Sequence, residues 1–246
     1  MGGALRQWSV EALNLPEHAD NPIHTDDGAR SAGFAAALVA GTTVHAYLTR
    51  PVVEAWGSAW LAEGASTLEL LAPVEAGERL DCVPVSGLDG LVEVKGEVRG
   101  DLRARLVAHR RKPEGFSYED RAGEVLPARL EALDGAHADY ARRAGEDLGL
   151  YAQEGLVHPC AWPTLANAVF VRHLVDGPWI HTRSRIVHHA AVAVGESVLV
   201  EATVVDRLEA RRGTRVVVDV EVSLDGIPLA SVRHEALVHL RPEVSS

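Results

Sequence analysis

The sequence is poor in cysteine and has no long apolar run, and both absences exclude whole classes of protein. Its 246 residues include two cysteines, Cys82 and Cys160, which lack the short spacings of zinc and redox motifs. No segment approaches the roughly 18 consecutive apolar residues that a membrane span needs, and the first residues lack the apolar core of a secretory signal. We therefore expect a cytoplasmic protein that does not enter a membrane and that keeps both thiols free and packed.

Positive charge is also scarce. Lysine and arginine together number 24 against 35 aspartate and glutamate residues, so the formal net charge is −11. Nucleic-acid binding relies on a basic surface, and we expect no nucleic-acid partner. The chain also lacks Gly-x-Gly-x-x-Gly, Walker, Gly-x-Ser-x-Gly and His-Glu-x-x-His motifs. These absences argue against a nucleotide cofactor, a hydrolase-type serine nucleophile and a metal site.

Alternating apolar residues near the end of the chain predict a β-hairpin. The segment from Arg215 to Leu224 places a valine at every second position from 216 to 222. Asp225-Gly226 then supplies a tight turn, and residues 230–240 alternate again. Alternation over residues 198–204 predicts a third strand before this hairpin.

The same order of strands occurs earlier, so the chain contains a repeat. Residues 80–85, 91–98 and 102–109 each have the pattern of a strand. The glycines that precede the two sets of strands, Gly77 and Gly195, are 118 residues apart, and Trp60 and Trp179 are 119 apart. A constant offset of this size indicates two copies of one domain.

Each copy also begins with a helix. Trp162-Pro163 is a typical helix start with proline in the first turn, and apolar residues recur behind it at helical spacing. In the first copy we expect a helix from Gly41 through Leu48, which Pro51 then breaks or restarts. A helix followed by antiparallel strands in each half predicts an α+β fold, in which each sheet wraps around its own helix.

The segment between the copies differs in composition, because it contains scattered charged residues, glycine and proline. We interpret residues 113–155 as a crossover with one helical stretch from Ala128 to about Gly149. The predicted organisation is then an N-terminal repeat over residues 1–112, this linker, and a C-terminal repeat over residues 156–246.

Chemistry is concentrated in the segment from His18 to Asp27. Asn21-Pro22 marks a turn, so His24 is presented from a loop, and Gly41 follows 17 residues later at the predicted helix start. Helix N-termini expose free N–H groups that favour negative charge. Glycine at that point lets a ligand carbonyl approach the backbone closely. Together these features predict an imidazole that faces an oxyanion site.

This segment resembles the signature of the MaoC-like (R)-specific enoyl-CoA hydratases and dehydratases. The resemblance rests on Asn21-Pro22-Ile23-His24-Thr25-Asp26, Ala29, Gly33-Phe34 and Gly41. It implies a double hotdog, with two antiparallel sheets, each around a central helix, packed as a pseudo-dimer. It also implies a cytoplasmic lyase of fatty acid metabolism that acts on 2-enoyl or 3-hydroxyacyl thioesters. Coenzyme A or the phosphopantetheine of an acyl-carrier protein would then be part of the substrate, with no further cofactor.

The resemblance also assigns roles to residues. His24 would be the general acid and base, and the Gly41 N–H would bind the thioester oxygen. Asn21, Thr42 and His158 are further candidates for substrate binding, and His158 precedes the helix of the second copy. That copy lacks an Asn-Pro-x-His loop, so we expect one site per chain and a structural role for the C-terminal repeat. Either a monomer or a homodimer is compatible with two repeats in one chain.

One position departs from the family pattern, which has an aspartate five residues before the motif histidine. Ala19 stands there, with Asp20 beside it as the candidate substitute. Three readings follow: Asp20 replaces the missing carboxylate, His24 acts alone on an altered substrate, or the site only binds. Two alternatives to hydration therefore stay open. One is a hotdog thioesterase that uses Asp20 or Glu17 to activate water, and the other is a non-catalytic acyl-thioester-binding protein.

Overall fold

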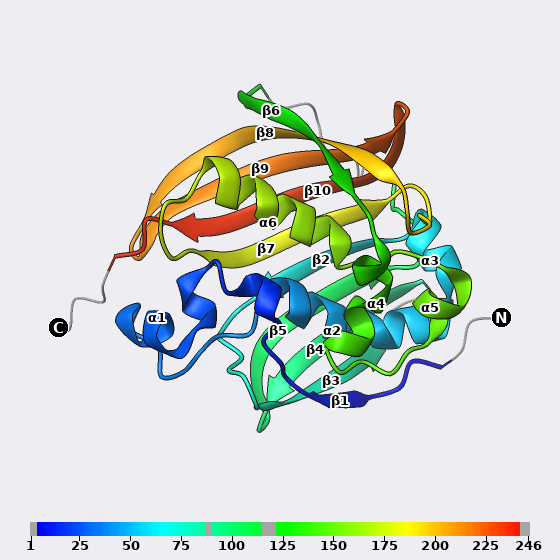
Figure 1. Cartoon of the computed structure of the whole chain (residues 1–246). Coiled ribbons are helices and arrows are strands. Elements are labelled where there is room, and N and C mark those ends of the chain that lie inside the picture. The colour runs from blue at the N-terminus through cyan, green and yellow to red at the C-terminus, as the bar shows by residue number, and fades with distance from the viewer. Residues whose placement is uncertain (1–3, 87–89, 115–121, 242–246) are drawn as a thin grey trace.

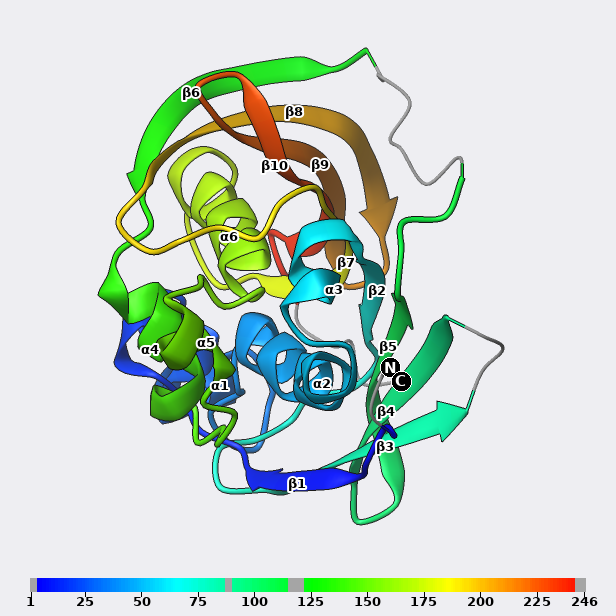
Figure 2. The same cartoon turned by 90° about the vertical axis from the view of Figure 1, so that its right-hand side faces the viewer.

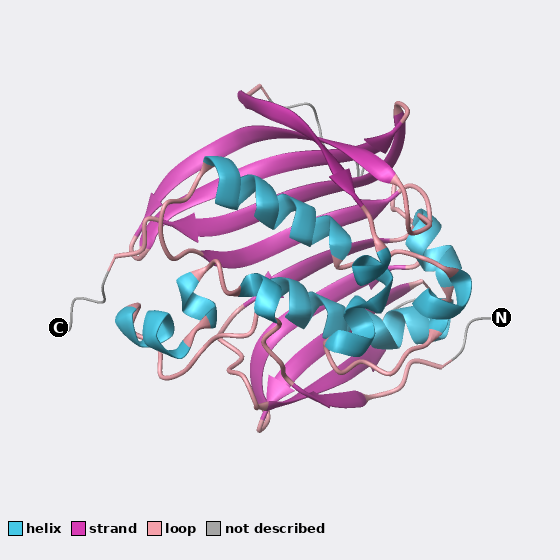
Figure 3. Cartoon of the chain, in the orientation of Figure 1, coloured by secondary structure: helices cyan, strands magenta, loops and turns pink. Residues whose placement is uncertain are grey.

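The computed structural model describes residues 4–86, 90–114 and 122–241 of the chain. Its strands form one antiparallel sheet of ten strands in the order β1-β3-β4-β5-β2-β7-β10-β9-β8-β6 (Figures 1 and 3). The strands are β1 (Trp8–Glu11), β2 (Ala65–Leu70), β3 (Arg79–Ser86), β4 (Leu91–Val98), β5 (Asp101–His109), β6 (Glu124–Ala132), β7 (Ile180–His188), β8 (Ser197–Ala210), β9 (Gly213–Leu224) and β10 (Ile227–Val238). The helices are α1 (Asp26–Ser31), α2 (Gly41–Trp56), α3 (Ser58–Glu63), α4 (Gly135–Arg143), α5 (Leu150–Glu154) and α6 (Ala161–His173), with short 3-10 turns η1 (Pro16–His18) and η2 (Pro22–His24).

The strand order confirms the repeat. Counted from the two edges inward, β1, β3, β4, β5 and β2 of the first copy match β6, β8, β9, β10 and β7 of the second. The two halves meet where β2 pairs with β7, from Ala65 opposite Val187 to Glu69 opposite Arg183. One continuous sheet therefore joins two hotdog halves, as the predicted pseudo-dimer requires.

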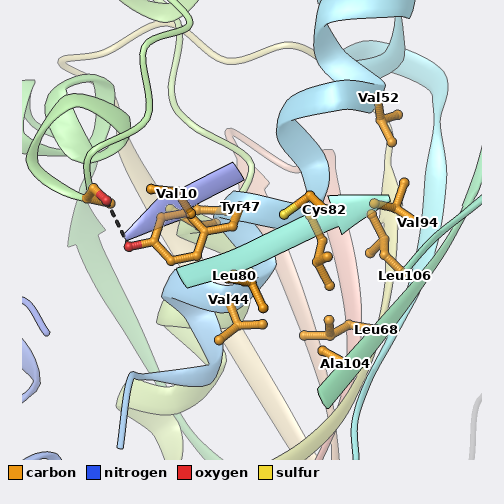
Figure 4. Close-up of a cluster of buried hydrophobic side chains, with 14 of the residues drawn as sticks. Val10, Val44, Tyr47, Val52, Leu68, Leu80, Cys82, Val94, Ala104 and Leu106 are labelled. Atoms are coloured by element: carbon orange, nitrogen blue, oxygen red, sulfur yellow. Dashed lines mark hydrogen bonds between the residues drawn. The ribbon is translucent and has the colours of Figure 1, made fainter. Parts of the chain in front are cut away.

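The sheet curves around two helices, α2 in the first half and α6 in the second (Figure 2). In α2, Val44, Leu48 and Val52 recur at intervals of four residues and are buried in the first of two apolar clusters. Figure 4 shows this cluster, in which Tyr47 also donates its hydroxyl to the carbonyl oxygen of Ala144 at 2.8 Å. The central helix is thus tied both to the sheet behind it and to the segment that covers its open side.

Two local expectations were wrong. Helix α2 does not break at Pro51 but continues to Trp56, because burial of its last turns compensates for the N–H group that proline lacks. The single helix expected over residues 128–149 is instead the end of strand β6, then α4 and α5. Strand β6 pairs with β8 at the sheet edge, and the edge position accommodates its Pro127.

Both cysteines are free and buried, as expected. Burial raises the pKa of the Cys82 and Cys160 thiols above the ordinary value, so both are held in the neutral form. Within the described residues, no helix is long and apolar enough to cross a membrane.

The two-layer packing predicts unequal effects of one chemical change made at two strand positions. Leu106 of β5 is fully buried, whereas Leu130 of β6 is 72% exposed. We expect Leu106→Ala to lower the free energy of unfolding by about 2–5 kcal/mol, since it leaves a cavity in the core. Leu130→Ala should change it by less than about 0.5 kcal/mol. Urea unfolding measures both, and equal effects would contradict the packing described.

Candidate active site

A cavity of about 210 Å³ lies at the junction of the two repeats. The first repeat contributes the His24 loop, the start of α2 and residues 70–74, and the second contributes residues 179–182 at the start of β7. Most of the wall is apolar. The polar and glycine residues that line it are Asn21, His24, Gly41, Asn167, His181, Thr182 and Arg212. The cavity therefore lies between the 18–27 segment and Gly41, the two features that the sequence predicts to face each other.

His24 is held in one tautomer by the backbone. Its Nδ1 lies 2.8 Å from the carbonyl oxygen of Leu38, so Nδ1–H donates and Nε2 carries the free lone pair. Leu38 is fixed in turn, because its N–H donates to the carbonyl of Ile23 at 2.9 Å. Burial lowers the pKa of His24, although the bond to Leu38 opposes this shift. The side chain is thus a neutral base at physiological pH.

Gly41 begins α2 on the cavity wall. The N–H groups of Thr43 and Val44 both donate to the carbonyl of Ala40. The Gly41 N–H donates to no backbone carbonyl within the described ranges. A Cβ atom added to Gly41 would lie 2.5 Å from both His181 Nδ1 and Leu70 Cδ1. Glycine therefore allows α2 to begin directly against His181 and Leu70 at the cavity wall.

Asn21 joins the two repeats. Its side-chain Nδ2 donates to the carbonyl of Trp179 at 2.9 Å, and its Oδ1 lies 3.5 Å from the backbone nitrogens of Trp179 and Ile23. The Asn21 amide therefore holds the His24 loop against the start of β7 through these hydrogen bonds, although Asn21 also lines the cavity.

The acidic candidates lie outside this cavity. Asp20 and Glu17 line an adjoining pocket, here called the outer pocket, which shares Asn21, His24, Asn167 and Trp179 with the first, inner cavity. Glu17 is paired with Arg143, at 2.5 Å between Oε1 and Nη1. Ala19 is exposed. Among the described residues that line the inner cavity there is no aspartate or glutamate.

Two expected binding residues are placed elsewhere. His158 is fully buried, with Nε2 3.1 Å from Glu146 Oε2 and Nδ1 accepting the N–H of Cys160 at 3.1 Å. Both ring nitrogens are thus occupied, and His158 is not among the residues that line the cavity, contrary to expectation. Thr42 is also fully buried and outside the lining, because it is one helix position beyond Gly41 and faces the interior.

The structure places two more histidines at the site, His18, to which the sequence assigns no role, and His181, which the sequence does not single out. His18 lies with its ring centroid 5.9 Å from that of His24, and its Nε2 is 3.2 Å from the hydroxyl of Tyr140. His181 enters the cavity wall from β7, and its Nε2 is 2.8 Å from Ser184 Oγ. Burial is the main cause that lowers their pKa values, to about 4 for His18 and about 3 for His181. The offset between Trp60 and Trp179 indicates the repeat, but it does not show which side chains of β7 face the cavity.

No protein-family model matches the chain. Solved structures with the same fold include a MaoC-like dehydratase, at 14% identity and a TM-score of 0.58, with 96% of this chain and 98% of that one covered. A conserved hypothetical protein of Mycobacterium tuberculosis described as a double hotdog aligns over 96% of both chains, at 15% identity and a TM-score of 0.64. A 12:0-ACP thioesterase of Umbellularia californica aligns over 97% and 94%, at 8% identity and a TM-score of 0.55. The chain therefore has the double hotdog fold, which MaoC-like dehydratases and thioesterases also have.

The buried histidines predict a loss of stability in mild acid. Burial lowers the pKa to about 3 for His181 and His188 and to about 4 for His18, from an ordinary value of 6.5. Below pH 6.5 these histidines bind protons in the unfolded chain but stay neutral in the folded chain. The free energy of unfolding therefore falls as pH falls toward 4. Each such histidine contributes a slope of about 1.4 kcal/mol per pH unit.

Urea unfolding between pH 7.5 and 5 measures this slope, above the range in which most carboxylates titrate. His188→Gln should flatten it by about one proton. A stability that stays constant across this range would contradict the burial of neutral histidines.

Proposed function

We propose that the chain is an acyl-thioester enzyme that reversibly hydrates a 2-enoyl thioester to a 3-hydroxyacyl thioester. One observation carries this proposal. His24 has its Nδ1 bonded to Leu38 and its Nε2 free, in a cavity that also contains the first residue of α2. A base and a helix N-terminus on one wall are what addition of water to a conjugated thioester requires.

The reaction balances with these two groups. His24 Nε2 takes a proton from water as the water oxygen bonds to the β-carbon, and the π electrons move onto the thioester oxygen. The Gly41 N–H donates to that oxygen while it carries negative charge. The imidazolium then gives its proton to the α-carbon, which restores neutral His24 and the thioester carbonyl. A lowered pKa suits this cycle, because the protonated histidine readily returns its proton.

The position of the carboxylates favours hydration over thioester hydrolysis. In the thioesterase alternative, Asp20 or Glu17 would direct water at the thioester carbonyl. Both line the outer pocket, and Glu17 is engaged by Arg143. A non-catalytic binding protein is the second alternative, and it predicts tight binding without turnover.

The apolar lining of the cavity indicates the class of substrate. An apolar cavity at the repeat junction suits an acyl chain, with coenzyme A or a carrier-protein phosphopantetheine as the attached group and no further cofactor. We propose action in the cytoplasm, as a monomer or homodimer, in fatty acid metabolism. The protein-bound form of the substrate makes an acyl-carrier protein a candidate partner.

The proposal predicts that His24→Gln lowers the hydration rate about 100-fold to 10,000-fold, the usual contribution of a general acid–base group. Loss of enoyl absorbance from crotonyl-CoA and from a longer enoyl-CoA measures hydration. A parallel assay for free thiol measures hydrolysis. The exposed His173→Gln is the matched control and should retain the wild-type rate.

Full activity in His24→Gln would reject the role of this residue. Thiol release by the wild-type protein would favour the thioesterase alternative. Tight binding with neither signal would favour the binding protein.

A further inference from the structure

A second histidine faces Gly41 from the other repeat. His181 is 6% exposed, and its Nδ1 would lie 2.5 Å from a Cβ added to Gly41, so the ring rests directly against the start of α2. Its Nε2 is 2.8 Å from Ser184 Oγ, which is itself 2.8 Å from His234 Nδ1. The rings of His181 and His234 also stack, with centroids 4.1 Å apart. The contacts with Ser184 and His234 therefore fix the position and orientation of the His181 ring.

The nitrogen that faces Gly41 has no partner. His181 Nδ1 is buried and makes no hydrogen bond within the described part of the chain. Buried polar atoms in folded proteins are nearly always paired, and an exception at a cavity wall points to a partner that a ligand supplies. Gly41, whose N–H donates to no backbone carbonyl within the described ranges, lines the same cavity.

The hydrogen-bond chain allows two proton arrangements. In one, Ser184 donates to His181 and accepts from His234, so His181 presents Nδ1–H toward Gly41. In the other, Ser184 donates to His234, and His234 then carries an Nε2–H without a partner deep in the core. Each arrangement leaves one buried N–H without a partner, His181 Nδ1–H in the first and His234 Nε2–H in the second. Only in the first does this N–H belong to a residue of the cavity wall, where a bound ligand can accept it, and this arrangement makes His181 a donor.

We propose that His181 is a second catalytic hydrogen-bond donor, whose Nδ1–H and the Gly41 N–H bind the same thioester oxygen. This inference rests on the proposed function and specifies how charge on that oxygen is stabilised. Because burial lowers the pKa of His181 to about 3, the ring acts as a neutral donor and transfers no proton. One repeat thus supplies the base and the helix N-terminus, and the other supplies the second donor.

His181→Phe tests the proposal, because it keeps the ring volume and removes Nδ1. We expect kcat for crotonyl-CoA to fall about 100-fold to 1,000-fold, as for the loss of one oxyanion donor, with a small change in KM. His181→Asn places an amide N–H near the position of Nδ1 and should recover part of this loss. His189→Phe is the matched control. His189 also forms a hydrogen bond with a serine, Ser231, but lies outside the cavity lining. The activity of the His189→Phe variant should therefore stay at the wild-type level.

A second readout does not depend on turnover. In a His24→Gln background, crotonyl-CoA bound to the protein should show a thioester C=O stretch at lower frequency than the same complex with His181→Phe added. A structural role alone would not move this band. Far-UV circular dichroism and the urea midpoint establish that each variant is folded. If His181→Phe does not fold, the comparison is made with His181→Leu and with Ser184→Ala, which releases the ring from its anchor.

The outcomes separate the two proposals. Hydration by the wild type with full activity in folded His181→Phe would overturn the role of His181 and leave the proposed function intact. Binding without hydration would overturn the proposed function, and the C=O band would then decide His181 by itself. An unshifted band, or no binding of crotonyl-CoA at all, would overturn this inference.

Discussion

The antiparallel pairing of β2 with β7 is the interaction on which the rest of the structure depends. It turns two half-sheets into one sheet and brings the start of β7 against the start of α2. Asn21 then fastens the His24 loop to Trp179, one residue before β7 begins. Neither repeat alone encloses the cavity, because its walls come from both. The site is therefore a property of the junction.

The two repeats have the same arrangement of strands around a helix, but equivalent positions in them carry different chemical groups. The isolated bridge between Leu38 and Glu75 has its counterpart, 118 residues later, between Leu156 and Ala193. By the same offset His158 corresponds to Ala40, whose neighbours Val39 and Gly41 line the cavity. His158 is instead buried beside Glu146 with both ring nitrogens bonded, and it does not line the cavity. The start of the second repeat's helix is therefore packed core.

The sequence predicted the architecture well, because period-2 alternation is a local pattern and the repeat offset can be counted along the chain. It singled out Gly41 and His24, which both line the cavity, since a turn and a helix start also have local signals. It missed the edge strand β6, whose exposed Val125 and Leu130 weaken the alternation. It also missed His181, because which residues of β7 face α2 depends on the register between the repeats. Contacts made across 140 residues leave no mark in a single sequence.

The central claim is that two neutral histidines, one from each repeat, present opposite functions to one cavity. Nitrogen-15 NMR of the imidazole rings tests it most directly, because the chemical shift of each ring nitrogen reports whether that nitrogen carries a proton. At pH 7 we expect both His24 and His181 to be protonated on Nδ1 alone, so that His24 offers a lone pair from Nε2 and His181 a donor toward Gly41. A proton on His24 Nε2, or on His181 Nε2 in place of Nδ1, would contradict the account.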